Sequence, residues 1–343
     1  MPLTERERQV LEAVIETFVQ TAEPAGSRTV SKVLGLGLSP ATIRNTMSDL
    51  EEKGYLYHPH TSAGRIPTDL AYRAYVDSLM RLPPPAVSPA EDDRIRSGLA
   101  GRHSPVDQVL QRAAQVLGVL TQELGVAVGP ALDRAVLERL DLTQVSSERL
   151  LLVLSLRSGV VRTIFVEVPS HMAPDVVAQV AVVLNERLAG LELSEIRASL
   201  PERLRDAAPG PDAGELLNIF VQEAEGLFDV AAAPSAGVVL SSAQMLAGQP
   251  EFSTASRLQG LMEVTERRDL LRDTLTRQRE GLTITIGGEH QDPKLAPFTL
   301  VTARYRVGPL AGVIGILGPT RMPYEKVVAL VNHTSRLVGE LLA

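Results

Sequence analysis

Cysteine is absent from this chain of 343 residues, and so is every chemistry that needs a thiol. Disulfides, thiolate nucleophiles, iron–sulfur clusters and cysteine-based zinc sites are therefore excluded. No apolar run reaches the roughly 18 residues that a membrane-spanning helix needs. The first residues also lack the basic stretch followed by an apolar segment that is typical of a secretory signal. We expect a soluble, cytoplasmic protein that does not associate with membranes.

An excess of positive charge is missing as well. The chain has 34 Lys and Arg against 41 Asp and Glu, which gives a formal charge of −7 and a pI near 5.5. General nucleic-acid coat proteins are usually strongly basic, so this class is excluded. The composition is otherwise that of a globular protein, with 44% hydrophobic residues. Because one core stops growing near ~250–300 residues, the length predicts two or three domains.

The pattern of the N-terminal segment predicts two helices joined by a short connection. Thr4 and Glu7 have capping-box spacing, and the apolar residues that follow repeat with the period of a helix. Pro24 and Gly26 end this helix, and Ser27 can cap a short second one. The connection between them is tight, as in a helix-turn-helix.

A third helix has both of its ends marked in the sequence. Ser39 followed by Pro40 is an N-cap with proline at the first helical position, and Gly54 lies just beyond the end near Lys53. One face of this helix is apolar and carries Ile43, Met47 and Leu50. The opposite face is polar or basic and carries Thr42, Arg44, Asn45 and Ser48.

The segment after Gly54 predicts a β-hairpin. YLYHPHTSAGRIPT begins with residues that favour strands, and Ser62-Ala63-Gly64-Arg65 then forms a turn with an arginine at its tip. Three helices, a tight turn and a basic hairpin make residues 1–81 a winged helix-turn-helix DNA-binding domain.

The polar face of the third helix has the residue types that read DNA bases. Arginine can bind guanine O6 and N7 through two hydrogen bonds, and asparagine can bind adenine N6 and N7 in the same way. Arg44 and Asn45 are therefore candidate base-reading residues. Thr42 and Ser48 can reach base edges or phosphates. Ser39 and the free N–H groups beside it suit a phosphate, and Arg65 suits a phosphate or the minor groove.

Local charge supports this interpretation. Residues 28–65 contain five basic residues, Arg28 among them, and three acidic ones, a local charge of +2 within an acidic chain. The competing explanation is that Arg44 and Asn45 only solvate an exposed helix. The combination of the cap, the turn, the helix spacing and the arginine in the hairpin favours DNA binding.

Beyond residue 81 the sequence predicts a linker and a sheet domain that is interrupted by helices. LPPPAVSPA is rich in proline, so residues 82–91 are expected to be an extended linker. Strands are expected within 135–168, with a hairpin at Ser158-Gly159, and a helical block within 173–228. Strands follow at 236–241, 282–286, 298–306 and 310–317, and a helix from Pro323 to Leu342 closes the chain. The fold class is α+β, in several domains.

No credible metal, cofactor or catalytic site emerges from the sequence. His58 and His60 share one strand face, but no third ligand completes a metal set nearby. The glycines between 308 and 318 lack the Gly-Lys-Ser/Thr of a phosphate loop, and no nucleophile elbow is present. We expect no cofactor, no metal and no enzymatic activity.

Several motifs occur together and in order: LSPATIRNTMSDLEEKGYLYHPHTSAGRIPTDLAYRAYVD, QPEF at 249–252, GGEH, LVTARY and GVIGILGPTRMPYEKVV. In them the chain resembles the heat-inducible transcription repressor (HrcA) family over nearly its whole length. The resemblance implies a repressor that binds, as a homodimer, an inverted-repeat operator in double-stranded DNA upstream of chaperone operons. It places the recognition helix at 39–53 and the wing at 55–67.

The resemblance also implies a domain plan and a protein partner. Residues 92–171 and 236–343 would form a GAF-like domain, and residues 172–235 an inserted dimerisation domain. A GroEL-type chaperonin would keep the repressor active.

Two other functions stay open from the residues. The first is a winged-helix regulator that responds to a small molecule, with an effector pocket among the apolar interior positions of 298–317 in the GAF-like domain. The second is an enzyme that is tethered by its DNA-binding module, and the missing catalytic motifs argue against it.

Overall fold

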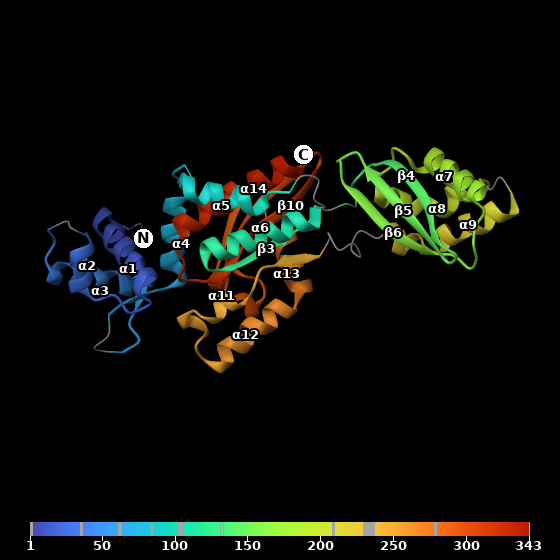
Figure 1. Ribbon diagram of the computed structural model, residues 1–343. Helices are drawn as coiled ribbons and strands as arrows, with labels where there is room; N and C mark the ends of the chain where they lie inside the picture. The colour runs from blue at the N-terminus through green and yellow to red at the C-terminus, as the bar shows by residue number, and fades with distance from the viewer. Residues whose placement is uncertain are drawn as a thin grey trace.

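The computed structural model describes residues 3–34, 37–60, 64–83, 85–101, 106–130, 132, 134–207, 210–228, 237–277 and 280–342. It contains both helices and strands, arranged in three units. A head at the N-terminus and an insert at the opposite end flank a central sheet body (Figure 1). The α+β class predicted from the sequence is confirmed.

The head consists of three helices and a short hairpin. Its elements are α1 (Glu5–Thr21), α2 (Ser27–Leu34), α3 (Pro40–Glu52), β1 (Leu56–Tyr57) and β2 (Ile66–Pro67). The predicted capping box is present, since Glu7 and Thr4 cap each other's backbone N–H groups. Ser39 caps α3 by accepting a hydrogen bond from the Thr42 N–H at 3.1 Å. Apolar side chains of all three helices are buried together, among them Val14, Val30 and Ile43.

The hairpin is anchored at its base. β1 and β2 pair antiparallel, with Leu56 opposite Pro67. Arg65 forms a β-bridge with Ala25, which precedes α2. The predicted turn at 62–65 lies partly outside the described residues, because these resume only at Gly64. Helix α4 (Asp69–Leu79), capped by Thr68, leads from the head to the sheet body.

The sheet body is built on five antiparallel strands in the order β7-β3-β10-β9-β8. The strands are β3 (Leu124–Val128), β7 (Val238–Leu240), β8 (Leu282–Ile286), β9 (Phe298–Val307) and β10 (Leu310–Pro319). In β9, Val301 and Ala303 belong to one apolar cluster and Phe298 and Leu300 to another. Both faces of the sheet are therefore buried.

Helices cover the two faces as separate layers (Figure 1). One layer consists of α5 (Pro89–Leu99), α6 (Val106–Thr121) and α14 (Tyr324–Leu342). The opposite layer contains α11 (Gln244–Ala247), η2 (Pro250–Phe252), α12 (Ala255–Glu266) and α13 (Arg268–Thr276), while η3 (Gly287–Glu289) and η4 (Pro293–Leu295) connect β8 to β9. Helix α6 crosses β3 so closely that a Cβ on Gly125 would lie 1.9 Å from the Ala114 carbonyl oxygen.

The predicted linker at 82–91 is too long at its C-terminal end. Ser88 and Glu91 form a capping box, and Pro89 occupies the first position of α5. These residues start a helix, because proline is well suited to a first helical turn. The helix packs on α6.

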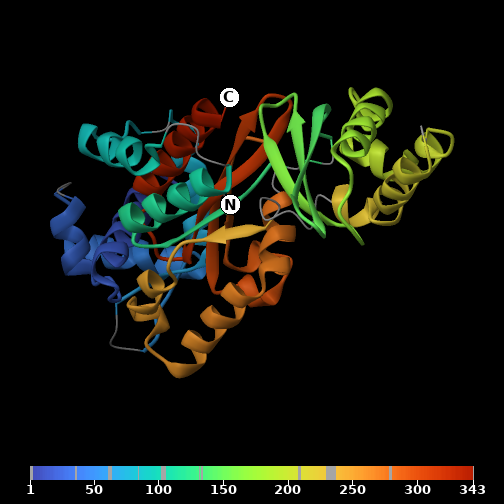
Figure 2. The same cartoon turned by 45° about the vertical axis from the view of Figure 1, so that its right-hand side comes forward.

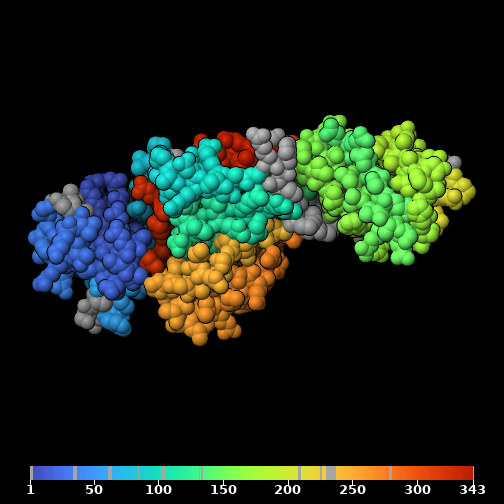
Figure 3. All heavy atoms as spheres, viewed as in Figure 1, coloured from blue at the N-terminus to red at the C-terminus, as the bar shows by residue number. Residues whose placement is uncertain are grey.

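The insert is larger than the sequence predicted. Strands β4 (Leu137–Ser146), β5 (Arg149–Leu156) and β6 (Val161–Glu167) form their own three-stranded sheet. With it lie α7 (Pro174–Leu188), α8 (Leu193–Leu204), α9 (Pro211–Gln222) and α10 (Ala224–Phe228). Figure 3 shows this unit at the end of the molecule opposite the head, and Figure 2 shows its strands beside the five-stranded sheet as a separate sheet.

The boundary predicted at 171–172 is therefore wrong, because it divides this unit. Among the described residues these strands form a sheet of their own, in the order β4-β5-β6, and α7 packs directly on β4. There the Asn185 side chain accepts from the Leu140 N–H at 2.9 Å and donates to its carbonyl at 2.6 Å. Strands 137–167 thus belong with the helices that follow them, and not with the five-stranded sheet.

Candidate nucleic-acid interface

The outward face of α3 exposes the two side chains that the sequence singled out as base readers. Arg44 and Asn45 are exposed, whereas Ile43, Met47 and Leu50 face the core of the head. Within the described residues, neither Arg44 nor Asn45 has a hydrogen bond or ion pair through its side chain. Both side chains are therefore available to an external partner.

The three smaller polar candidates lie beside them and are partly satisfied within α3. Ser39 Oγ and Thr42 Oγ1 share a hydrogen bond of 3.0 Å at the start of the helix. Ser48 Oγ donates to the Arg44 carbonyl at 3.2 Å. Hydroxyl groups keep further donor or acceptor capacity after one bond, so all three can still contact a phosphate.

Arg65 lies against α3 and not on a free hairpin tip. Its Nη2 is 2.8 Å from Glu51 Oε2, and only 19% of its side chain is exposed. The other Glu51 oxygen contacts His58 Nδ1, so one carboxylate holds both arms of the hairpin. The sequence did not indicate this role of Glu51, because its partners are separated from it by 7 and 14 positions. Arg65 therefore orients the hairpin in this structure.

The remaining basic residues divide into exposed and paired ones. Arg28 and Lys32 are exposed on α2. Lys53 instead reaches back to α1, where its Nζ is 2.7 Å from Glu7 Oε1. The positive charge available to a partner thus comes mainly from Arg28, Lys32 and Arg44.

The described residues show no metal-binding arrangement and no membrane helix. They contain no group of three or more His, Asp or Glu side chains placed to hold a metal ion. None of their helices combines the length and apolar character needed to cross a bilayer. His58, one of the two histidines considered as ligands, is occupied by Glu51.

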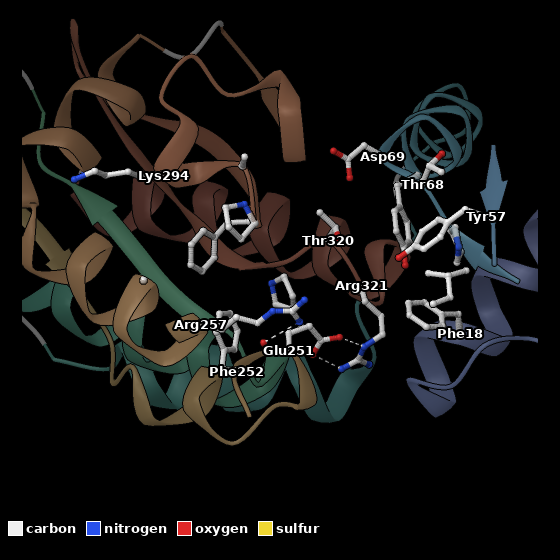
Figure 4. Close-up of a pocket in the computed structure, with 18 of the residues that line it drawn as sticks. Phe18, Tyr57, Thr68, Asp69, Glu251, Phe252, Arg257, Lys294, Thr320 and Arg321 are labelled. Atoms are coloured by element: carbon white, nitrogen blue, oxygen red, sulfur yellow. Dashed lines mark hydrogen bonds and ion pairs between the residues drawn. The ribbon is translucent and has the colours of Figure 1, made fainter. Parts of the chain in front are cut away.

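The positions proposed for an effector pocket are filled by the protein core. Residues such as Val301 and Ile316 pack under helices on one face of the sheet, and Leu300 and Leu317 on the other. A pocket of about 680 Å³ lies elsewhere, between the head and the sheet body. Figure 4 shows Phe18 and Tyr57 on its head side, and Phe252 and Arg257 on its body side.

Known proteins resemble this chain over its full length. A family model described as the HrcA protein C-terminal domain matches residues 107–328. The chain is 41% identical to the heat-inducible transcription repressor HrcA of Chlorobium phaeobacteroides strain BS1, over 99% of each sequence. The chain belongs to the heat-inducible transcription repressor HrcA family. The HrcA repressor of Desulforamulus reducens is 35% identical over 100% of this chain and 98% of its own.

A solved structure supports the fold. The crystal structure of a hypothetical protein at 2.2 Å resolution aligns over 99% of both chains, with a TM-score of 0.69 and 22% sequence identity. The alignments with the HrcA repressor and with this solved structure each cover the head, the sheet body and the insert. The resemblance seen in the sequence motifs is therefore confirmed.

The ion pair between α1 and α3 generates a prediction about pH. The hydrogen bond from Lys53, aided by the Thr4 N–H, lowers the pKa of Glu7 from 4.5 to about 2. A carboxylate with a lowered pKa stabilises the fold above its unfolded pKa, and this contribution is lost as pH falls from about 4.5 toward 2. Glu7→Gln should cost about 2 kcal/mol of unfolding free energy at pH 7, and its difference from wild type should shrink below about pH 4.5.

Urea denaturation of both proteins between pH 7 and pH 4 measures this difference. Glu52→Gln is the matched control, because Glu52 is exposed on α3 and has no side-chain partner among the described residues. A difference between Glu7→Gln and wild type that does not change with pH would contradict the assignment.

Proposed function

We propose that this protein represses heat-shock chaperone operons by binding an inverted-repeat operator as a homodimer. The observation that carries the proposal is the exposed, unpaired Arg44–Asn45 pair on a capped helix, in a chain 41% identical to a heat-inducible repressor. Repression is a binding function, so the proposal includes no enzymatic activity.

The head acts as a winged helix-turn-helix. Helix α3 would enter the major groove with its N-terminal residues on the base edges, and the hairpin would follow the backbone as the wing. Arg44 and Asn45 would read bases, while Ser39, Thr42 and Ser48 and the exposed Arg28 would contact phosphates. Arg65 would support this contact mainly by fixing the wing, since its guanidinium is held by Glu51.

A two-fold dimer explains why the operator would be an inverted repeat. Each protomer presents one α3, and a two-fold axis relates the two half-sites as it relates the protomers. The sheet body would act as the GAF-like domain that connects each head to the dimer interface. Binding to DNA would then require both heads at one fixed separation.

Removal of Arg44 tests the assignment of the interface. Arg44→Ala should weaken binding to the full operator by roughly 10- to 100-fold, because a base contact by arginine contributes about 1–3 kcal/mol. Footprinting and gel-shift titration on the promoter of a chaperone operon give the site and the affinity. Arg187→Ala is the control, since Arg187 is exposed on α7 in the insert, far along the chain from the head. Equal affinities of Arg44→Ala and wild type would remove Arg44 as a reader.

The insert provides a surface for the dimer. Phe165 and Val161 are exposed on the outer face of β6, and 62% of Phe165 is accessible. Leu151 lies opposite Phe165 on β5 and is only half-buried, so the apolar surface continues across the strands. An exposed apolar sheet face of this kind is typical of a protein interface.

A charge on this face should dissociate the dimer. Phe165→Asp would place an ionised group where apolar side chains meet, so it should sediment as a monomer at concentrations at which the wild type is dimeric. Val182→Asp, at an exposed position on α7 of the same insert, should remain dimeric. A dimer formed by Phe165→Asp as readily as by wild type would place the interface elsewhere.

Dependence on a GroEL-type chaperonin forms the last part of the proposal, and the family resemblance supports it. Because a change of about 1.4 kcal/mol alters a folded-to-inactive ratio tenfold, a marginally stable repressor would be sensitive to chaperonin supply. After mild heating, operator binding should recover further with chaperonin and ATP than without them. Equal recovery in both samples would exclude this dependence.

A further inference from the structure

The C-terminal end of helix α1 is contacted by a positively charged side chain of the sheet body. A helix leaves its last four carbonyl groups without intrahelical partners, and this end carries partial negative charge. The last turn of α1 contains no basic residue. Instead Arg321, between β10 and α14, donates from Nη1 to the Val19 carbonyl oxygen at 2.9 Å. The two residues are 302 positions apart in the sequence.

The sheet body holds this arginine in place. Glu251, in η2, accepts from Arg321 Nε and, at 3.0 Å, from Nη2 (Figure 4). Only 14% of the Arg321 side chain and 23% of the Glu251 side chain are exposed. Bidentate pairing fixes the plane of a guanidinium, and low exposure strengthens it. Arg321 therefore connects a carboxylate of the body to a carbonyl of the head.

A second carboxyl group nearby does not compete for this arginine. Glu123 is 2% exposed, and burial raises its pKa to about 8. It accepts a hydrogen bond from Gln249 Nε2 at 3.1 Å. At pH 7 Glu123 is therefore largely neutral, and Glu251 is the carboxylate that holds Arg321.

Helix α4 is attached to the body independently of Arg321. Arg73 donates to the Glu289 carboxylate and, at 2.7 Å, to the Ile284 carbonyl. The Gly288 N–H donates to Asp69 Oδ2 at 2.9 Å. The rings of Tyr72 and Tyr324 pack with centroids 5.7 Å apart. Helix α4 thus belongs mechanically to the body.

The space between these two attachments is not filled. The pocket of about 680 Å³ extends from Phe18 and Tyr57 of the head to Phe252 and Thr320 of the body. The head is therefore joined to the body by contacts with α4 on one side of the pocket and by Arg321 on the other. Without Arg321, the head would be held through its contacts with α4 alone, and its direction would be less tightly fixed.

The attachment explains three sequence motifs that DNA contact leaves unused. QPEF supplies Glu251, GGEH supplies Glu289, and GPTRMPYEKVV supplies Arg321. Arg321 contacts the head, Glu289 contacts α4, and Glu251 holds Arg321. The exposed face of α3 remains uncovered in this arrangement, so the attached state leaves Arg44 and Asn45 free.

We propose that Arg321 is a positioning residue for operator binding, which fixes the direction of α3 by joining Glu251 of the body to Val19 of the head. The inference rests on the proposed function, because a fixed head direction matters only when two heads must reach two half-sites together. A dimer with loosely held heads would bind one half-site as before and gain less from the second.

A distance measurement tests the joint itself. Because the chain lacks cysteine, Glu52→Cys on α3 and Gln111→Cys on α6 give two unique exposed sites for spin labels. Labelled protein is diluted into an excess of unlabelled protein, so that each dimer carries one labelled protomer. Pulsed electron double resonance should show a broader head-to-body distance distribution in Arg321→Gln than in the unsubstituted pair. Arg306→Gln is the matched control, since it breaks an exposed ion pair with Glu280 on the body.

A binding measurement tests the consequence. Arg321→Gln should bind the full operator roughly tenfold more weakly and a single half-site within about twofold of wild type. Glu251→Gln should broaden the distance distribution and weaken full-operator binding, but less than Arg321→Gln does, because the Val19 contact remains. It also serves as the second variant if Arg321→Gln does not fold.

Three results would overturn the inference. These are an unchanged distance distribution in both variants, an equal loss on full operator and half-site, and tighter operator binding by Arg321→Gln. If wild type bound no operator at all, the proposed function would fail, while the distance distributions would still show whether Arg321 holds the head.

Discussion

Both faces of the five-stranded sheet are apolar, and the need to bury them organises the rest of the chain. One face is covered by α6 and α14 and the other by α12 and α13. These helices come from segments on either side of the insert, so the chain must return to the sheet after residue 228. The insert leaves the body between β3 and β7, at one edge of the sheet. The head is attached at the other end, where β10 leads into α14.

This arrangement separates the two proposed tasks of the protein. In the proposal, DNA contact belongs to the exposed face of α3, and self-association to the exposed apolar face of β6. The five-stranded sheet lies between them (Figure 1) and is buried on both faces. A body of this kind can transmit a fixed separation from the dimer interface to the heads only if the joint to each head is also fixed. Arg321 matters for this reason, since its hydrogen bond to Val19 ties α1 to the body in addition to the packing of α1 on α4.

The head could be predicted largely from the sequence because its signals are local. The Thr4–Glu7 capping box and the Ser39–Pro40 helix start need only residues within one turn. The central strand β3 was not predicted, because LGVAV continues the apolar pattern of α6 and is buried on both faces, so it shows no alternation. The strands at 137–167 were recognised, but which sheet they join depends on their packing with α7. Sequence patterns do not contain that information.

The same distinction applies to the candidate interface. Arg44 and Asn45 were identified from residue type and helix position, and their exposure follows from the helix period alone. Arg65 was assigned to DNA, but Glu51 holds it through a tertiary contact that spacing does not reveal. Lys53 is likewise paired with Glu7. Of the five basic residues between 28 and 65, two are therefore neutralised within the head. Neither the net charge of −7 nor the local charge of +2 therefore shows how many basic side chains are free to bind DNA. In the proposed function, DNA would therefore be contacted by a small set of free cations beside an asparagine, which would favour a particular sequence over DNA in general.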